Sequence, residues 1–191
     1  MKASFRESSQ IRANVTPTPV QKRGLRCLQP FTSKRNVSRL PAPNLRHLCD
    51  LKVHLDSIRE LGMTPEGQRR IIPIIGGTCS GERLQGTLLH VGADWQCIRA
   101  DDSAELDARY ALQTQDGALI EIRNHGYRHG PPEVIAALAR EEAVEASCYY
   151  MRTMARLVTG DPRYDWVNRI LCVGTGARQA NSVEITLYEI E

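Results

Sequence analysis

Segments of alternating apolar and polar residues, separated by turn residues, fill most of this chain and constrain its fold more than any other feature. AELDARYALQT, ALIEIRN and SVEITLYEI each alternate over the length of a single strand. Stretches such as TQDGA and GARQANS separate such segments at close spacing. Many short strands with frequent turns are typical of an antiparallel sandwich or barrel. We expect an all-β, mainly antiparallel fold, closed into a single β-barrel because closure removes exposed strand edges.

The composition allows one sizeable core. The chain has 191 residues, of which 41% are hydrophobic, but only two Phe and two Trp, so the core depends on aliphatic side chains. No apolar run reaches the roughly 20 residues of a membrane-spanning helix. Six cysteines without Cys-x-x-Cys spacing indicate free, mostly buried thiols in a reducing compartment. We therefore expect a soluble, cytoplasmic protein with no membrane partner.

The charge of the chain changes near residue 41. Residues 1–40 hold nine Lys or Arg and one acid, Glu7, whereas the rest of the chain holds 16 basic and 21 acidic residues. We predict a basic, disordered leader over residues 1–41 and a barrel domain over residues 42–191. A start assigned too far upstream, an organellar targeting peptide and a nucleic-acid-binding arm are alternatives for the leader. The acidic remainder argues against a nucleic-acid partner.

One helix is expected directly after Pro131. The two prolines at 131 and 132 fix its first turn, and Glu133 suits the positive end of the helix dipole. It either packs on the outside of the sheet or closes one end of the barrel. Its apolar stripe consists of Val134, Ile135, Leu138 and Ala139.

The Asp116-Gly117 pair predicts a hairpin with a defined register. A three-residue loop, with Gly117 in the left-handed conformation, keeps the apolar residues on one face. The facing pairs are then Leu112–Ile120, Tyr110–Ile122 and Ala108–Asn124. The opposite face carries Asp107, Arg109, Glu121 and Arg123. This charged face is either a solvated surface with weak ion pairs or the lining of a lumen where acid/base chemistry becomes possible.

The stretch RNHGYRHGPPEV places His125 and His129 four residues apart. On a helix such a pair could bind a metal, but the glycines argue against a helix, and no third ligand has a recognisable spacing. We expect no metal. We predict instead that the strand ends at Arg123 and Asn124, that the chain turns at Gly130 into the helix, and that His129 could reach a cavity mouth.

Further candidates come from polar or aromatic residues within the predicted strands. Asp94 is either a turn cap or a cavity acid, and Trp95 is either a core residue or a platform for a ligand. A phenol beside Arg152 could bind a carboxylate or enolate oxygen, although such a pair is also common at a barrel rim. Trp166 and Asn168 share one face of a strand-like segment, from which the amide could orient a carbonyl. The sequence does not favour Cys79 or Cys97 as a nucleophile.

Several separated motifs together resemble one known family. They are GADWQ, AELDARYALQTQDGALIEIRN, RHGPPEV, YYMRT and TGDPRYDWVNRILCVGTG, in this order. They resemble the domain of unknown function DUF3237, also called UPF0311, over about residues 42–191. The resemblance implies a closed antiparallel barrel of calycin or allene-oxide-cyclase type, with no settled reaction. His125, Met151 and Met154 depart from the residues that are usual at these positions.

The first functional hypothesis is a barrel that binds a small, oxygenated organic molecule in a polar lumen, without a cofactor. The chemistry could be isomerisation, cyclisation or lyase chemistry, and the sequence does not decide whether the ligand is transformed. The alternative is a non-catalytic interaction module with a packed barrel, whose partner includes a second copy of the chain in a homo-oligomer. The candidate cavity residues are Asp94, Trp95, Asp107, Arg109, Arg123, Asn124, His129, Tyr149, Arg152, Trp166 and Asn168.

Overall fold

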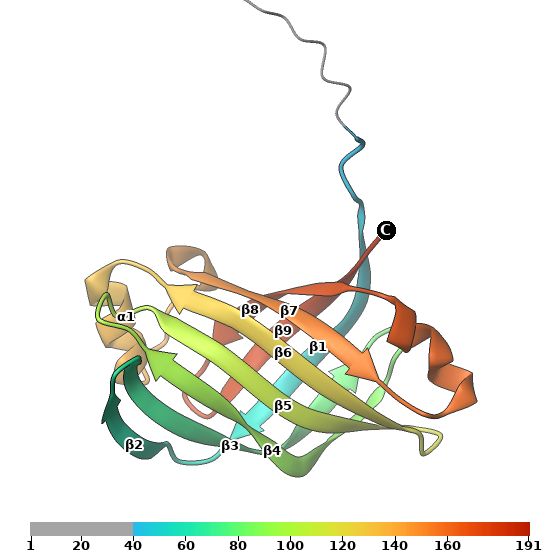
Figure 1. Cartoon of the computed structure of the whole chain (residues 1–191), viewed down its shortest axis with the longest axis horizontal. Coiled ribbons are helices and arrows are strands. Elements are labelled where there is room, and N and C mark those ends of the chain that lie inside the picture. The colour runs from blue at the N-terminus through green and yellow to red at the C-terminus, as the bar shows by residue number, and fades with distance from the viewer. Residues whose placement is uncertain (1–39) are drawn as a thin grey trace, which may run out of the picture. The chain divides into compact units, whose positions relative to one another are not determined.

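The computed structural model describes residues 40–191, and the strands of this part form a closed antiparallel barrel (Figure 1). The strands follow the order β1-β9-β8-β7-β6-β5-β4-β3, and β1 also pairs with β3, which closes the barrel. β2 pairs with β3 only. The predicted closed barrel is confirmed, whereas residues 1–39 of the predicted leader lie outside the described residues. The bounds are β1 Leu45–Leu55, β2 Arg59–Thr64, β3 Gly67–Ser80, β4 Gly86–Ile98, β5 Ala104–Thr114, β6 Leu119–His129, β7 Tyr150–Val158, β8 Cys172–Arg178 and β9 Ser182–Ile190.

Helical segments lie at the two ends of the barrel (Figure 1). The predicted helix is confirmed as α1 (Pro132–Ala139), and its apolar side packs on Ala104, Leu106 and Met151 at one end. The short 3₁₀ helix η1 (Ala146–Cys148) follows α1, and a second 3₁₀ helix, η2 (Pro162–Arg169), packs on the core at the other end. None of the helices in residues 40–191 has the length and hydrophobicity to span a membrane.

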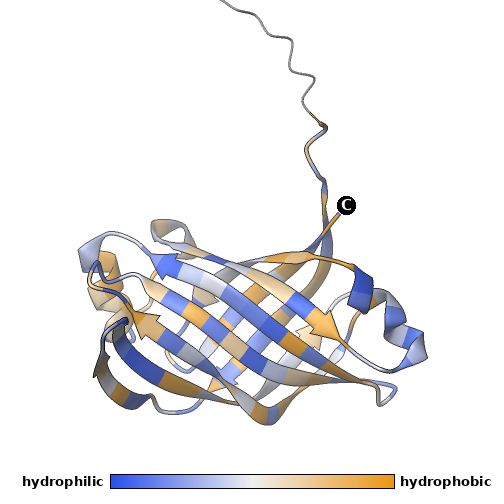
Figure 2. Cartoon of the chain, viewed as in Figure 1, coloured by the Kyte–Doolittle hydropathy of each residue, from blue (hydrophilic) through white to orange (hydrophobic). Residues whose placement is uncertain are grey.

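The predicted hairpin register is confirmed. Leu112 faces Ile120, and Ala108 faces Asn124. Gly117 has a φ of 89° in the loop, a conformation that glycine adopts without strain. The alternation along β5 and β6 is visible as alternating colours in Figure 2. Since the apolar side of this hairpin is buried, its charged side is the outer, solvated surface of the barrel.

Two local predictions are wrong. β6 does not end at Asn124 but continues to His129, because Gly126 lies inside the strand rather than at a turn. A Cβ atom on Gly126 would lie 2.2 Å from the carbonyl oxygen of Arg152, so glycine permits the close approach of β7. The segment containing Trp166 is not strand-like: it forms η2, which Pro162 begins and which Asp161 caps by accepting a hydrogen bond from the backbone N of Arg163, at 3.0 Å.

Aliphatic residues fill the barrel toward η2. Among the side chains that are at most 2% exposed there are Leu112, Ile120, Ile122, Leu157 and Leu187. Five cysteines in the described part of the chain are free thiols, and all of them except Cys148 are buried. Burial raises the pKa of the Cys172 thiol to about 11. This end of the barrel is therefore a conventional packed core.

Candidate functional site

The interior toward α1 differs from the rest of the core because polar side chains point into it. Asp94 and Gln96 alternate along β4, and Asn124 and Arg128 share the inner face of β6 on either side of Gly126. The free space among them is about 40 Å³. Apolar side chains such as Ile72, Leu106 and Met151 complete the walls. The polar side chains lining this part of the lumen are Asp94, Gln96, Tyr110, Asn124, Arg128, Thr153 and Arg178.

A chain of hydrogen bonds holds Asp94 in place. Gln96 donates its amide to Asp94 Oδ2 at 2.5 Å, and the backbone N of Asp107 donates to Asp94 Oδ1 at 3.0 Å. Arg70 in turn donates to Gln96 Oε1 from Nε and Nη2, at 3.0 and 2.7 Å. Burial raises the pKa of the Asp94 carboxyl, and these hydrogen bonds, with the charges of Arg128 and Arg70, offset this only in part.

Three arginines approach the same space. Burial lowers the pKa of Arg70, Arg128 and Arg178, in the case of Arg128 to about 10. Within residues 40–191, no carboxylate oxygen lies within 4.0 Å of any of the three guanidinium groups. Arg178 donates from Nη1 to the carbonyl oxygen of Ser182 at 3.4 Å. All three remain protonated at neutral pH, so this end of the lumen is positively charged.

Four buried polar atoms facing the lumen have no hydrogen-bond partner in the described part of the chain. They are Tyr110 Oη, Asn124 Oδ1, Arg128 Nε and Thr153 Oγ1, of which the first two belong to neighbouring side chains that interact without a well-formed hydrogen bond. Leaving such an atom unpaired costs about 1 to 3 kcal/mol, and the large majority of buried polar groups are paired. All four belong to residues lining one lumen, on three neighbouring strands. Their convergence distinguishes this part of the lumen from the packed core toward η2.

The structure brings only some of the candidate cavity residues together. Asp94 and Asn124 line the lumen, and Tyr149 lies beside it, where its Oη accepts a hydrogen bond from the backbone N of Arg178 at 2.8 Å. Trp166 and Asn168 lie in η2 at the opposite end. The remaining candidates face outward on the barrel wall: Trp95, Asp107, Arg109, Arg123, His129 and Arg152.

The outward candidates have partners on the surface. Arg109 and Arg123 both form ion pairs with Glu121. The ring of His129 stacks on Tyr150, with 4.7 Å between centroids. His125 Nδ1 lies 3.2 Å from Asp107 Oδ1. In residues 40–191 no three His, Cys, Asp or Glu side chains are grouped so that they could hold a metal ion.

Sequence reasoning missed Arg70, which donates to Gln96, and several residues that line the lumen: Gln96, Tyr110, Arg128, Thr153 and Arg178. One signal was present for Arg128, because it has the same parity along the strand as Ile122 and Asn124, whose inward direction the hairpin predicts. It lies beyond the predicted strand end and was therefore not considered. Arg70 and Arg178 reach the lumen only through barrel closure, which no short stretch of sequence reveals.

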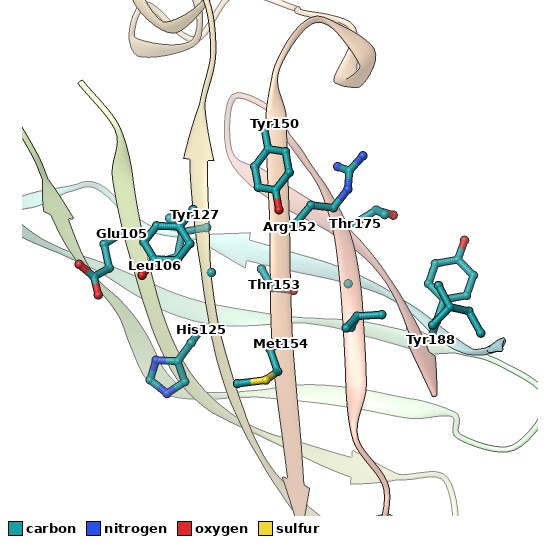
Figure 3. Close-up of a pocket in the computed structure, with 14 residues that line it drawn as sticks. Glu105, Leu106, His125, Tyr127, Tyr150, Arg152, Thr153, Met154, Thr175 and Tyr188 are labelled. Atoms are coloured by element: carbon teal, nitrogen blue, oxygen red, sulfur yellow. The ribbon is translucent and has the colours of Figure 1, made fainter. Parts of the chain in front are cut away.

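A second, open groove of about 580 Å³ lies on the outer wall over β6, β7 and β8. Figure 3 shows Tyr127, Tyr150 and Met154 on its surface, each between 44% and 55% exposed. The guanidinium of Arg152 lies 5.3 Å from the ring centroid of Tyr150. This groove is aromatic and solvated, whereas the lumen pocket is smaller, less open and lined by charged side chains.

Comparisons with known proteins agree with the fold. A family model for a protein of unknown function, DUF3237, matches residues 43–190. A UPF0311 protein of Rhodopseudomonas palustris is 38% identical over 150 residues, which cover 78% of this chain and 98% of that protein. The crystal structure of a conserved protein of unknown function from the same organism has a TM-score of 0.77 and covers 80% of this chain and 100% of its own. A beta-barrel like protein from Acinetobacter baumannii, 38% identical, has a TM-score of 0.71, with coverage of 81% and 99%.

Proposed function

The chain belongs to the DUF3237 family of proteins of unknown function, and we propose that its barrel binds a small oxygenated organic molecule at the polar end of the lumen. The observation that supports this most is the convergence of four unpartnered polar atoms on one lumen. In a purely structural core these positions would carry apolar side chains or paired polar groups.

The types of the unpartnered atoms define what such a molecule must offer. Arg128 Nε can only donate, Asn124 Oδ1 can only accept, and the hydroxyls of Tyr110 and Thr153 can do either. A ligand with carbonyl oxygens and at least one hydroxyl group satisfies this set. A hydrocarbon ligand would leave every one of these atoms unpaired.

Asp94 is the residue that we propose for acid/base chemistry. Its pKa is raised by burial, which increases the protonated fraction nearer neutral pH, and its two oxygens are oriented by Gln96 and by the backbone of Asp107. Isomerisation, cyclisation and lyase reactions next to a carbonyl each require a proton to be moved at carbon or oxygen, and a positioned carboxyl group can do this. A neighbouring arginine would stabilise the oxyanion that develops.

The free space limits how a ligand enters. About 40 Å³ is little more than the roughly 30 Å³ that one water molecule occupies in the liquid. A ligand of several heavy atoms therefore requires neighbouring elements to move. α1 is the element to expect, because it lies at the polar end and only Leu138 among its residues is buried.

Native mass spectrometry of the purified full chain tests this proposal. We expect a small organic mass to accompany the wild type and to be lost from the double variant N124L/T153V, which removes two unpartnered atoms with little change in volume. Thr175→Val, on the outer face of β8, is the matched control and should keep the ligand. A mass that stays bound to the double variant would place the binding site elsewhere.

The outer aromatic groove favours a second candidate function, a self-associating interaction module. Its volume far exceeds that of the lumen, and Tyr127, Tyr150 and Met154 expose apolar surface on it. Exposed aromatic patches of this kind often mark interfaces. Sedimentation velocity of the wild type and of the M154E variant tests this: a dimer that the variant abolishes supports self-association, and a monomer at all concentrations contradicts it.

A further inference from the structure

The arginines of the chain are distributed unusually between its surface and its interior. Within residues 40–191, nine arginines form ion pairs with carboxylates: Arg46, Arg69, Arg83, Arg99, Arg109, Arg123, Arg140, Arg163 and Arg169. Arg128 and Arg178, which line the lumen, and Arg70, which donates to the lining residue Gln96, form none among the residues that the structure describes. Charged groups need pairing most where water is excluded. In this part of the chain most outer arginines thus have a carboxylate partner, although the exposed Arg59, Arg152 and Arg156 do not, and the inner arginines have none within 4.0 Å.

Arg128 is the clearest case. Its side chain is 8% exposed, it lines the lumen, and its Nε has no acceptor in the described part of the chain. A guanidinium does not lose its proton in proteins, so it cannot escape the cost of burial by becoming neutral. Its surroundings offer only hydroxyl, amide and apolar groups, together with two further arginines and Asp94.

The charges of the side chains at the lumen indicate the charge that a ligand of Arg128 should carry. Arg128 and Arg178 line the lumen together with one carboxyl group, Asp94, whose hydrogen bonds come from Gln96 and a backbone amide. Outside this lining, Glu60 lies near enough to Arg70, and Glu141 near enough to Arg178, for their charges to oppose the lowering of the pKa of these arginines by burial. The side chains that line the lumen therefore carry an excess of one positive charge when Asp94 is ionised and two when it is protonated. From this excess, and from the unpaired Nε of Arg128, we infer that the lumen binds its ligand through an organic carboxylate group.

Carboxylate is favoured over other anions by shape. A guanidinium presents parallel N–H groups that match the two oxygens of a carboxylate, and the space of about 40 Å³ suits a group of this size. The nearby Asn124 and Thr153 would then contact the neutral oxygens of the same molecule. This inference rests on the proposed function, but it can fail while the proposed function stands.

The experiment compares carboxylates with uncharged molecules of the same shape. Acetate and benzoate are each paired with acetamide and benzamide, and dissociation constants are measured by ligand-detected NMR for the wild-type full chain. Arg128→Met is the test variant, and Arg156→Met, an exposed arginine on the outer face of β7, is the control. Chloride and inorganic phosphate are titrated as competitors. Arg178→Met serves if the first variant does not fold.

We expect each carboxylate to bind the wild type and the R156M variant at least about tenfold more tightly than its amide, and the R128M variant to lose this preference. Equal binding of acids and amides, abolished by N124L/T153V, would overturn the carboxylate inference and leave the proposed function intact. Displacement of benzoate by chloride or phosphate at equal concentration would show an unselective anion site and also overturn it. Absence of binding for every probe would contradict both.

Discussion

The two ends of the barrel interior are built from the same strands but differ in polarity and packing. Toward η2, β5 and β6 contribute Leu112 and Ile120, both 0% exposed, to one large cluster of buried hydrophobic residues. Toward α1 the same β6 contributes Asn124 and Arg128, and hydrogen-bonding groups remain unpaired. One half stabilises the fold, and the other retains groups that lower its stability. Such division is expected where a site is kept for another molecule.

The largest effect should come from damaging the apolar half. Leu112→Ala leaves a cavity in a packed region, and we expect a loss of about 2 to 5 kcal/mol in the free energy of unfolding, measured by urea denaturation. Leu119→Ala, at a position that is 56% exposed on the same hairpin, is the control and should change stability by less than about 0.5 kcal/mol. Similar losses in both variants would refute the assignment of the core to this end.

In the polar half, by contrast, we expect removal of a side chain to raise the free energy of unfolding. Arg128→Met replaces an unpaired buried charge with an apolar chain of similar length, and the free energy of unfolding without ligand should rise by about 1 to 3 kcal/mol. Thermal or urea unfolding measures it, with Arg156→Met as the exposed control. A clear loss of stability in R128M would mean that the guanidinium is well solvated or paired, and the contrast between the two ends would disappear.

The pH dependence of stability sharpens the comparison further. Because the pKa of Asp94 is raised, the folded state binds this proton more tightly than the unfolded state. The contribution of Asp94 is present below the ordinary value of 3.8 and is lost as the pH rises through the raised pKa. Arg70, Arg128 and Arg178 stay charged throughout this range. Asp94→Asn should therefore gain stability relative to the wild type as the pH rises from below 3.8 toward neutrality.

Asp161, a partly exposed carboxyl whose pKa is lowered rather than raised, provides a control with the opposite pH dependence of stability. Hydrogen bonding to Arg163 lowers the pKa of Asp161 to about 2, so its contribution is present above 3.8 and is lost as the pH falls through about 2. Asp161→Asn should lose stability relative to the wild type at neutral pH, with no difference at the lowest pH. Unfolding curves of both variants across this range would show opposite trends, and parallel trends would contradict the placement of Asp94 in a desolvated lumen.

Much of the fold could be predicted from short stretches of sequence, because turn residues, strand alternation and helix-starting prolines act locally. The Asp-Gly turn and the strict alternation of AELDARYALQT fix the register of β5 against β6, and the two prolines and the apolar stripe fix α1. η2 was missed because Trp166 and Asn168 alternate as a strand would, while the cap at Asp161 and the proline that follows it carry the helical signal.

The candidate site was harder to predict because it breaks the rule that identified the strands. Alternation assumes that charged residues face water, and this holds for Arg109 and Arg123, which the hypothesis placed in a possible lumen. It fails for Arg128 and Arg178, which line the lumen from two different strands, and for the partly buried Arg70, which donates to Gln96. Only the pairing of β1 with β3, absent from any local pattern, defines what is inside.

That closing pair also has a consequence for the order of events in folding. The lumen does not exist in any single hairpin, since its lining includes Ile72 on β3, Arg128 on β6 and Arg178 on β8, which surround one space only when the barrel closes. Non-local pairing of this kind is slow to form, and here it must also bring the like charges of Arg128 and Arg178 together in a desolvated interior. Electrostatic repulsion then opposes the last step of assembly. An anion occupying that space would relieve the repulsion, so a carboxylate ligand of the kind that we propose would also help the barrel to close.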